Sequence, residues 1–365
     1  AECRFLLLSP NNLLKPSDGG PVAVPSQDMV LGIYYLTQER PGAKGEGKIF
    51  KSVNEAILAY ENGAVTLHSR IKVRMTKTMP DGKEITGVGR FIFNEIIPQD
   101  LGFVDRSIPG NELKLEVDFL VAKKQNKQIL EKVINIHGAT KTAEVLDAVK
   151  AMGYKYSTRA AMTVSISDMT VPPEKPAMIK AAQDTVDRIT KQYKRGLITE
   201  EERYKEVVET WKETDDELTK VLLEGLDKYN NIFMMADSGA RGSNQQIKQL
   251  AGMRGLMADT TGRTIELPIK SNFREGLDVL EYFMSAHGAR KGLSDTALRT
   301  ADSGYLTRRM VDVSQELSIR ETDCSEGRSE IPGIVVRAFM DGKETIESLK
   351  DRITGRFACE DIYDK

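Results

Sequence analysis

The chain has 365 residues, of which 40% are hydrophobic and 29% are charged, a composition ordinary for a soluble globular protein with two or three cores. Its 52 Lys and Arg against 54 Asp and Glu give a formal net charge of -2, which excludes a chain that binds nucleic acid by its overall charge. Phe5–Leu8 is too short an apolar run to cross a bilayer, and three scattered cysteines do not make a disulfide framework. We expect a cytoplasmic protein without a signal peptide.

Both ends of the sequence predict a fragment of a longer protein. Ala1–Ser9 reads as the last turns of a helix already under way, and Arg356–Asp361 stops without a terminating element. A processed protein could begin in the same way, so the ends alone leave both origins open.

The first 158 residues predict an α+β module with short strands. Ser52–Glu61 begins with a capping residue and reads as a helix, which Asn62–Gly63 can close. Apolar and polar residues alternate over Val65–Arg74, the period of a half-buried strand. Asp81–Gly82 indicates a hairpin turn, and Gly89–Phe93 is a candidate second strand.

Two further helices are predicted in the same module. They cover Lys127–Ile136 and Thr142–Met152, and Gly138 and Gly153 are the expected stops. No internal repeat or low-complexity run is visible.

The prolines of Pro172–Pro176 mark a boundary, after which the pattern becomes that of long amphipathic helices. Apolar residues recur every three or four positions over Met178–Tyr193 and again over Tyr204–Leu222. Gly196 permits a tight turn between them, and the capping box Thr199–Glu202 opens the second helix. The remaining faces carry dense charges of mixed sign. They are either a solvated surface or an arm for a partner protein, and the pattern does not separate the two.

The loop Asp237–Ser243 contains two glycines and precedes a predicted helix. Ser243 and Gln246 form the capping box at the start of this helix. The helix N-terminus offers free N–H groups, with Arg241 beside it and Lys248 and Arg254 further along. The arrangement is a candidate anion site, although its glycine spacing matches neither a Walker loop nor a dinucleotide fingerprint.

The stretch Phe273–Leu317 has helical composition and no proline, yet it contains Gly288, Gly292 and Gly304. As one helix it would span roughly 60 Å, and each interior glycine would cost about 1 kcal/mol relative to alanine. Both ends are apolar, whereas Ser285–Ser303 is mainly polar, as in a helix that bridges a wet cleft. The alternative is two helices broken between Gly288 and Gly292.

Seven stretches of sequence then identify a family. They are Asn11–Pro16, Val24–Gly32, Met235–Ser243, Gln249–Gly255, His287–Leu293, Asp295–Ala301 and Ser303–Arg309. In this order along nearly the whole chain they resemble the largest subunit of bacterial DNA-directed RNA polymerase, the last three matching its bridge helix. The resemblance favours one continuous helix.

The resemblance implies a multi-domain α+β fragment. Residues 1–158 would form a pore domain of the secondary channel, and residues 159–255 a funnel domain with an antiparallel helical hairpin, a coiled coil, at 174–229. Residues 256–365 would begin the cleft domain, with the bridge helix at about 273–317.

The resemblance also implies roles for particular residues. Arg241 would reach the triphosphate of the incoming nucleotide, and Gln249 and Arg254 would line the same pocket. A guanidinium fork beside a helix N-terminus suits phosphate oxygens.

Template and RNA–DNA contacts are expected along the bridge helix. Small side chains there would let the backbone approach a base, basic ones would reach phosphates, and the glycines would act as hinges; ordinary surface solvation stays open for each basic residue. The expected contact residues are Arg290, Lys291, Thr296, Thr300, Ala301, Gly304, Tyr305 and Arg308.

The cofactors implied are Mg²⁺ and Zn²⁺ in the full enzyme, with neither expected on this chain. Cys324 resembles the first of four zinc thiolates, but the other three would lie beyond Lys365. The magnesium-binding Asp-Phe-Asp-Gly-Asp loop of this nucleotidyltransferase is absent from the sequence. We therefore expect no RNA synthesis by the chain alone.

The expected partners are the beta, alpha, omega and sigma subunits, template DNA, nascent RNA, nucleoside triphosphates, and transcript-cleavage factors at the hairpin. The expected location is the cytoplasm, in association with the nucleoid, and no membrane is expected as a partner. Two alternatives come from other classes. A helical adaptor would bind partners through the hairpin, but it leaves the long helix's glycines unexplained. A small phosphate-binding enzyme needs a base or metal cluster near Arg241, where Asp237, expected to cap its loop, is the nearest carboxylate.

Overall fold

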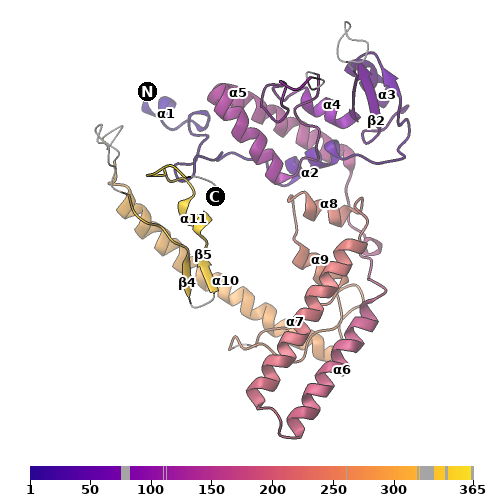
Figure 1. Cartoon of the computed structure of the whole chain (residues 1–365), viewed down its shortest axis with the longest axis vertical. Coiled ribbons are helices and arrows are strands. Elements are labelled where there is room, and N and C mark those ends of the chain that lie inside the picture. Colours follow the sequence, from indigo (N-terminus) through magenta and orange to yellow (C-terminus); the bar gives the residue numbers. More distant parts are fainter. Residues whose placement is uncertain are drawn as a thin grey trace. The chain divides into compact units, whose positions relative to one another are not determined.

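The computed structural model of the chain describes residues 1–74, 83–109, 111, 113–259, 261–318, 320, 333–341 and 344–362. Helices dominate and two small sheets accompany them, which confirms the α+β class (Figure 1). The chain divides into two compact units, Ala23–Ala289 and the smaller pair of segments Ala1–Val22 with Arg290–Lys365. Within the described residues, no helix combines the length and the apolar character that crossing a membrane requires.

The core of the larger unit is built on helix α2 (Asp28–Thr37), which packs along α5 (Lys123–Ala160). The two helices approach so closely that a Cβ at Gly32 would lie 1.9 Å from the carbonyl oxygen of Gly153. A Cβ at Gly153 would in turn lie 2.6 Å from the carbonyl oxygen of Met29. Glycine at both positions is therefore a packing requirement.

The course of α5 corrects one sequence prediction and confirms another. Gly153 was expected to end a helix, but α5 continues to Ala160 because Gly153 serves the contact with α2 and keeps helical geometry. Gly138 does interrupt the helix, with φ 75° and ψ -175°. The Thr142 hydroxyl donates a 2.7 Å hydrogen bond to the Gly138 carbonyl oxygen. The predicted pair of helices thus exists as two segments of one kinked element.

A three-stranded sheet lies in the same unit. Strand β1 (Ile49–Phe50) runs parallel to β2 (Arg70–Arg74), which pairs antiparallel with β3 (Lys83–Gly87). The alternating burial predicted over Val65–Arg74 is present, but the hydrogen-bonded strand begins only at Arg70 because turns occupy the residues before it. The hairpin turn expected at Asp81–Gly82 lies outside the described residues.

The predicted strand Gly89–Phe93 is wrong: these residues belong to helix α4 (Val88–Asn94). Nearly every residue of α4 is buried, so the run has no alternation from which sequence could choose between strand and helix. Gly89 is required there, since a Cβ would lie 1.8 Å from the carbonyl oxygen of Leu36. Helix α3 (Val53–Glu61) begins at the predicted cap, Ser52, whose side chain accepts from the Glu55 amide.

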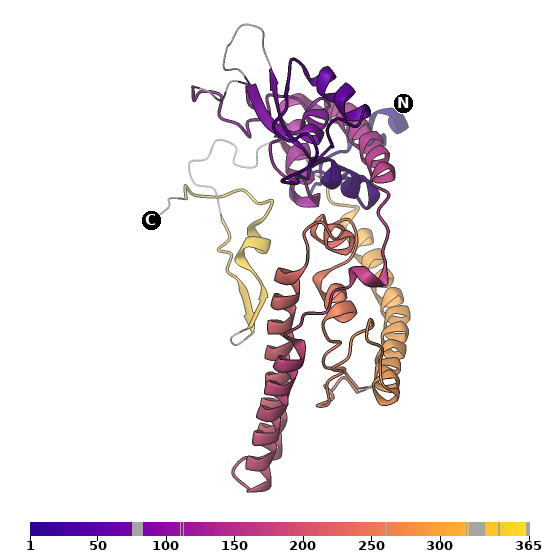
Figure 2. The same cartoon turned by 90° about the vertical axis from the view of Figure 1, so that its right-hand side faces the viewer.

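The predicted helical hairpin consists of α6 (Lys175–Lys194) and α7 (Glu200–Gly225), which lie side by side in both views (Figure 1, Figure 2). Gly196 adopts φ 76° in the turn. The capping box is formed: the Thr199 amide donates to Glu202 at 2.8 Å, and the Glu202 amide donates to the Thr199 hydroxyl at 3.3 Å. Ala182, Ile189, Val207, Trp211 and Leu218 form the buried seam between the helices.

Two short helices and a return segment complete the larger unit. A 3-10 turn (Ile166–Asp168) precedes the hairpin, and α8 (Asn231–Asp237) and α9 (Asn244–Ala251) follow it. The chain then folds back, with a bridge between Gly255 and Ile269.

The smaller unit contains α1 (Glu2–Phe5), a 3-10 turn (Ser9–Asn11), the antiparallel pair β4 (Phe339–Asp341) and β5 (Glu344–Glu347), and α11 (Leu349–Ile353).

Helix α10 (Val279–Ser314) starts in the larger unit and continues in the smaller one. It is shorter at both ends than the predicted 273–317, but it is uninterrupted through Gly288, Gly292 and Gly304 (Figure 1). The alternative of a break between Gly288 and Gly292 is therefore wrong. Its 36 residues correspond to a length of roughly 54 Å.

The contact between α2 and α5 predicts that Gly32→Ala lowers the free energy of unfolding by about 1–3 kcal/mol, because the added methyl overlaps the backbone of α5. Urea unfolding of the chain, followed by circular dichroism, measures the change. The matched control is Gly225→Ala, a helical glycine with open space around it, which should raise the free energy of unfolding by up to about 1 kcal/mol. Equal effects of both substitutions would contradict the packing argument.

Candidate functional site

The loop between α8 and α9 is held by its own backbone. Gly239 and Gly242 adopt φ 72° and 89°. These positive values belong to the tight turns that the two glycines were expected to permit. The Arg241 amide donates to the Met235 carbonyl at 3.1 Å, and the Ala240 amide donates to the buried Ser238 hydroxyl at 3.3 Å. At the start of α9, the Ser243 amide donates to the Gln246 side chain at 3.1 Å. The loop is a defined platform for Arg241.

The Arg241 side chain is exposed, and among the described residues its guanidinium has no ion pair or hydrogen bond. It borders a pocket of about 390 Å³. The other lining residues come from the start of α2, the last turn of α5 and the residues after it, α8, and the α8–α9 loop: Gln27, Asp28, Leu31, Ser157, Met162, Met235 and Ala240. The sequence analysis missed these neighbours, although Gln27 and Asp28 lie in one of the family motifs.

Gln27 is also one of two non-glycine residues with positive φ among those the structure describes, at φ 48°. Such strain is common at binding sites.

Arg254 is a half-buried cation that forms no ion pair with any residue in the described part of the chain. Its Nε and Nη1 atoms are buried and have no hydrogen-bond partner among the described residues. The guanidinium carbon lies 5.0 Å from the centre of the Phe273 ring, a cation–π contact that orients it. Burial lowers the pKa of Arg254 below its ordinary value. Buried donors of this kind are destabilising until an acceptor reaches them, and an anion would supply one.

The chain after α9 folds back as far as Phe273, and this segment brings two of the three predicted nucleotide contacts together. The Phe273 amide donates to the Gln249 carbonyl at 3.2 Å, and the Arg254 amide donates to the Ser271 carbonyl at 3.2 Å. Gln249 and Arg254 therefore flank one short stretch of chain. Arg241 lies before the other end of α9, and no hydrogen bond links it to either residue in the described part of the chain.

Lys248 was grouped with the cations of the anion site, and the structure corrects this. Its Nζ lies 2.5 Å from Oδ2 of Asp215 on α7, and both side chains are at least four-fifths buried. Burial raises the pKa of Asp215, and the ion pair with Lys248 opposes that rise. Lys248 is thus neutralised inside the protein and joins α9 to the hairpin, which a sequence motif cannot reveal.

Asp237 also has a different role from the loop cap that was expected. Its Oδ2 accepts a hydrogen bond of 2.7 Å from the Tyr34 hydroxyl on α2. This pair joins residues 203 positions apart in the chain.

The eight residues expected to contact template and RNA lie between Arg290 and Arg308 on α10. Thr296 and Thr300 donate their hydroxyls to backbone carbonyls one turn earlier, at 2.7 and 2.6 Å. A Cβ at Gly304 would meet nothing within 4 Å, so the backbone is open to a close approach there.

The aromatic and basic members of this group are largely exposed. Tyr305 is 61% exposed and lies under the Arg309 guanidinium, 4.3 Å from its carbon. Arg308 is 3.9 Å from Asp312, but with 81% of its side chain exposed this pair contributes little stability. Arg290 and Ala301 are exposed as well, and Lys291 is half-buried.

Burial along α10 is slight. Ser285 is its one buried residue among those described, whereas the apolar side chains Leu293, Leu298 and Met310 are 76%, 66% and 63% exposed. Tertiary packing supplies most of the stability of helices in proteins. The described residues therefore supply little of the packing that would stabilise α10.

The zinc prediction for Cys324 falls outside the described residues. Within them, no group of three or more His, Cys, Asp or Glu side chains is arranged for a metal ion. His68 is half-buried, its Nδ1 lies 2.9 Å from the Gln38 carbonyl oxygen, and burial lowers its pKa. His137 lies 2.7 Å from Asp100. Both histidines have structural partners.

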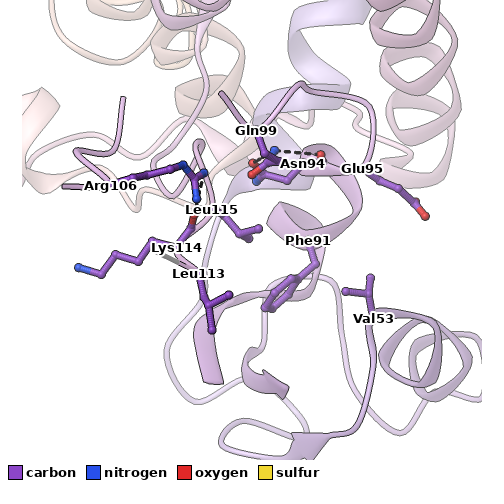
Figure 3. A pocket seen from close by; sticks show the side chains of 9 residues that line it. All are labelled: Val53, Phe91, Asn94, Glu95, Gln99, Arg106, Leu113, Lys114 and Leu115. Atoms are coloured by element: carbon purple, nitrogen blue, oxygen red, sulfur yellow. Dashed lines mark hydrogen bonds between the residues drawn. The ribbon is translucent and has the colours of Figure 1, made fainter. Parts of the chain in front are cut away.

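A separate pocket of about 320 Å³ lies in the α+β module and contains none of the predicted site residues (Figure 3). Its floor is apolar, formed by Val53, Phe91, Leu113 and Leu115. Two of the polar side chains that line it are hydrogen bonded to the protein: Gln99 donates to Asn94 at 3.1 Å, and Arg106 to the Lys114 carbonyl at 3.3 Å.

Three family descriptions match the chain in order. "RNA polymerase Rpb1, domain 3" matches residues 12–169, "domain 4" residues 198–274 and "domain 5" residues 276–346.

Curated relatives agree with these descriptions. The chain is 75% identical over 369 residues to DNA-directed RNA polymerase subunit beta' of Lachnoclostridium phytofermentans, with 100% of the chain and 29% of the relative covered. Identity is 60% over 367 residues to the subunit of Acetivibrio thermocellus and 58% over 370 residues to that of Caldicellulosiruptor saccharolyticus. These alignments cover 99% and 100% of the chain and 31% of each relative. The chain thus spans less than a third of the length of these relatives.

The buried ion pair between α7 and α9 predicts that Lys248→Met destabilises the hairpin base by about 3–5 kcal/mol, because Asp215 is left buried without its cation. Trp211, the single tryptophan of the chain, is buried on α7 and reports the unfolding by fluorescence. The double variant Asp215→Leu/Lys248→Met should recover most of the loss. A Lys248→Met variant as stable as the parent would show that the pair is dispensable.

Proposed function

The chain belongs to the family of the DNA-directed RNA polymerase beta' subunit, and on that basis we propose that it lines the channel that feeds nucleotides to the active centre and supplies the bridge helix beside it. The observation that carries the proposal is α10. It is an uninterrupted helix of 36 residues with interior glycines, and the described residues bury little of it. A helix with these properties suits a cleft in which nucleic acid passes along its side.

The nucleotide contact is proposed for Arg241, Arg254 and Gln249. Arg241 offers an exposed guanidinium with no acidic neighbour bound to it among the described residues, so its full charge is available to a triphosphate. Arg254 adds buried donors that have no partner within the described chain. Guanidinium groups bind phosphate oxygens through two parallel hydrogen bonds, which fixes orientation as well as affinity.

The template contact is proposed for the middle of α10. Ala301 and Gly304 have little or no side chain to project from the helix. The hydroxyls of Thr296 and Thr300 donate to carbonyls of their own helix. A flat nucleobase pair could therefore pack against the helix. Tyr305 would add an aromatic surface, with Arg290, Lys291 and Arg308 toward phosphates.

The chain's role in catalysis would be to bind and orient. The Mg²⁺ ions of the full enzyme would supply Lewis-acid chemistry, and the aspartate loop expected to hold them is not in this sequence. This chain would contribute the walls of the channel, phosphate contacts and a movable helix to a DNA-directed RNA polymerase.

The proposal extends to the modules and their partners. Residues 1–158 would be the pore domain, residues 159–255 the funnel domain and residues 256–365 the start of the cleft domain. The beta, alpha, omega and sigma subunits, template DNA, nascent RNA and nucleoside triphosphates would be its partners. Cys324 would ligate zinc together with cysteines of the longer subunit.

In the assembled polymerase, Arg241→Ala should raise the KM for nucleoside triphosphates by roughly tenfold or more, because a hydrogen bond to a charged group is worth about 1.5–3 kcal/mol. Primer extension at varied nucleotide concentration measures it. Arg188→Ala, which removes an exposed arginine of α6, serves as the control and should leave KM unchanged. An unaltered KM in Arg241→Ala would remove Arg241 from the nucleotide site.

The hairpin should bind coiled-coil factors that insert into the channel, such as transcript-cleavage factors. The base of the hairpin contains Asp215 and Leu218, which pack against the rest of the unit, so the deletion is confined to its outer part. A polymerase in which residues 187–209 are replaced by a short glycine turn should lose factor binding in a pull-down. The Arg241→Ala enzyme should keep it, and undiminished binding after the deletion would exclude the hairpin as the docking site.

A further inference from the structure

Tyr34 is buried in the core, yet its hydroxyl is hydrogen bonded to the exposed residue Asp237. Tyr34 is 2% exposed on α2, and its hydroxyl donates to Oδ2 of Asp237 at 2.7 Å. Burial first, and then this hydrogen bond, raise the pKa of the Tyr34 phenol above its ordinary value. The phenol therefore stays protonated at neutral pH and remains a donor.

A second contact holds the same loop from another helix. The amide of Lys123, the first residue of α5, donates to the carbonyl oxygen of Ser238 at 2.9 Å, and Ser238 is fully buried. A Cβ at Gly239 would lie 3.1 Å from Cβ of Lys123, so the loop passes close to the helix start. The loop is thus attached both to α2 and to α5, the pair that Gly32 and Gly153 lock together.

Only a few residues separate these attachments from Arg241, the proposed phosphate contact. Asp237 and Ser238 are followed by Gly239 and Ala240, and the Arg241 amide is tied back to the Met235 carbonyl at 3.1 Å. A shift of Asp237 would therefore carry the start of the Arg241 side chain with it.

We infer that Tyr34 is a positioning residue for the phosphate contact: through Asp237 its hydroxyl fixes the loop that presents Arg241. Tyr34 itself would not touch the nucleotide. The inference rests on the proposed role of Arg241, so its test includes Arg241 variants. The competing explanation is that the Tyr34 ring only fills the core, with no use for its hydroxyl.

Tyr34→Phe separates these explanations because the ring remains and only the hydroxyl is lost. Asp237 is exposed, so water can solvate its carboxylate in the variant, and the fold should be retained. In assembled polymerase carrying the full-length subunit, the KM for nucleoside triphosphates should rise roughly threefold to tenfold, the factor that one hydrogen bond corresponds to. The turnover number should fall by less than about twofold, because saturating nucleotide restores the bound state.

The chain offers a matched control in the neighbouring tyrosine. Tyr35 lies on the same helix and packs edge-on against His68, 4.5 Å between ring centres, away from the loop. Tyr35→Phe should leave both KM and turnover number unchanged. A merely structural loss would lower the fraction of active enzyme, and with it the turnover number, without raising KM.

A double variant tests the route of the effect. If Tyr34 acts through Arg241, Tyr34→Phe should add nothing to the KM of Arg241→Ala. Effects that multiply, or a KM in Tyr34→Phe equal to the parent's while Arg241→Ala raises it, would overturn the inference and leave the proposed function standing. No rise in either single variant would overturn the proposed phosphate contact itself.

Discussion

The larger unit depends on one close contact between two helix backbones, α2 against α5. Gly32 and Gly153 permit it, because a single methyl at either position would overlap the opposite backbone. Gly89 brings α4 against the carbonyl of Leu36 at the other end of α2 in the same way. The loop between α8 and α9 is then hydrogen bonded to both helices. Rigidity at the core and precision at the surface are therefore connected by a short chain of contacts, as binding sites require.

Two cations of one sequence region have opposite environments. Lys248 is buried with a carboxylate beside it, whereas Arg254 is half-buried with an aromatic ring beside it and donors unsatisfied by the described residues. A buried ion pair is already complete and resists a new ligand, while an uncompensated guanidinium favours one. Environment, more than residue type, decides which basic residue can bind an anion.

Local signals in the sequence were sufficient where the structure is decided locally. Ser52, Thr199 and Gly196 take the cap and turn conformations that their side chains favour, and the period of the apolar residues located the hairpin. Gly153 and Gly89–Phe93 were misread because distant backbone, invisible in a local window, determines their surroundings. The same reason hid the partners of Lys248 and Asp237. For Arg241, Gln249 and Arg254, family motifs named the residues, but only the fold shows that the latter two flank one segment.

The sparse cover of α10 has a consequence for the life of the free polypeptide. The leucines, Met310 and the aromatic residues of α10 are exposed to solvent along most of the helix. Exposed apolar side chains of this kind promote self-association as concentration rises, even where polar residues lie between them. The free polypeptide should therefore aggregate unless this helix is covered soon after synthesis.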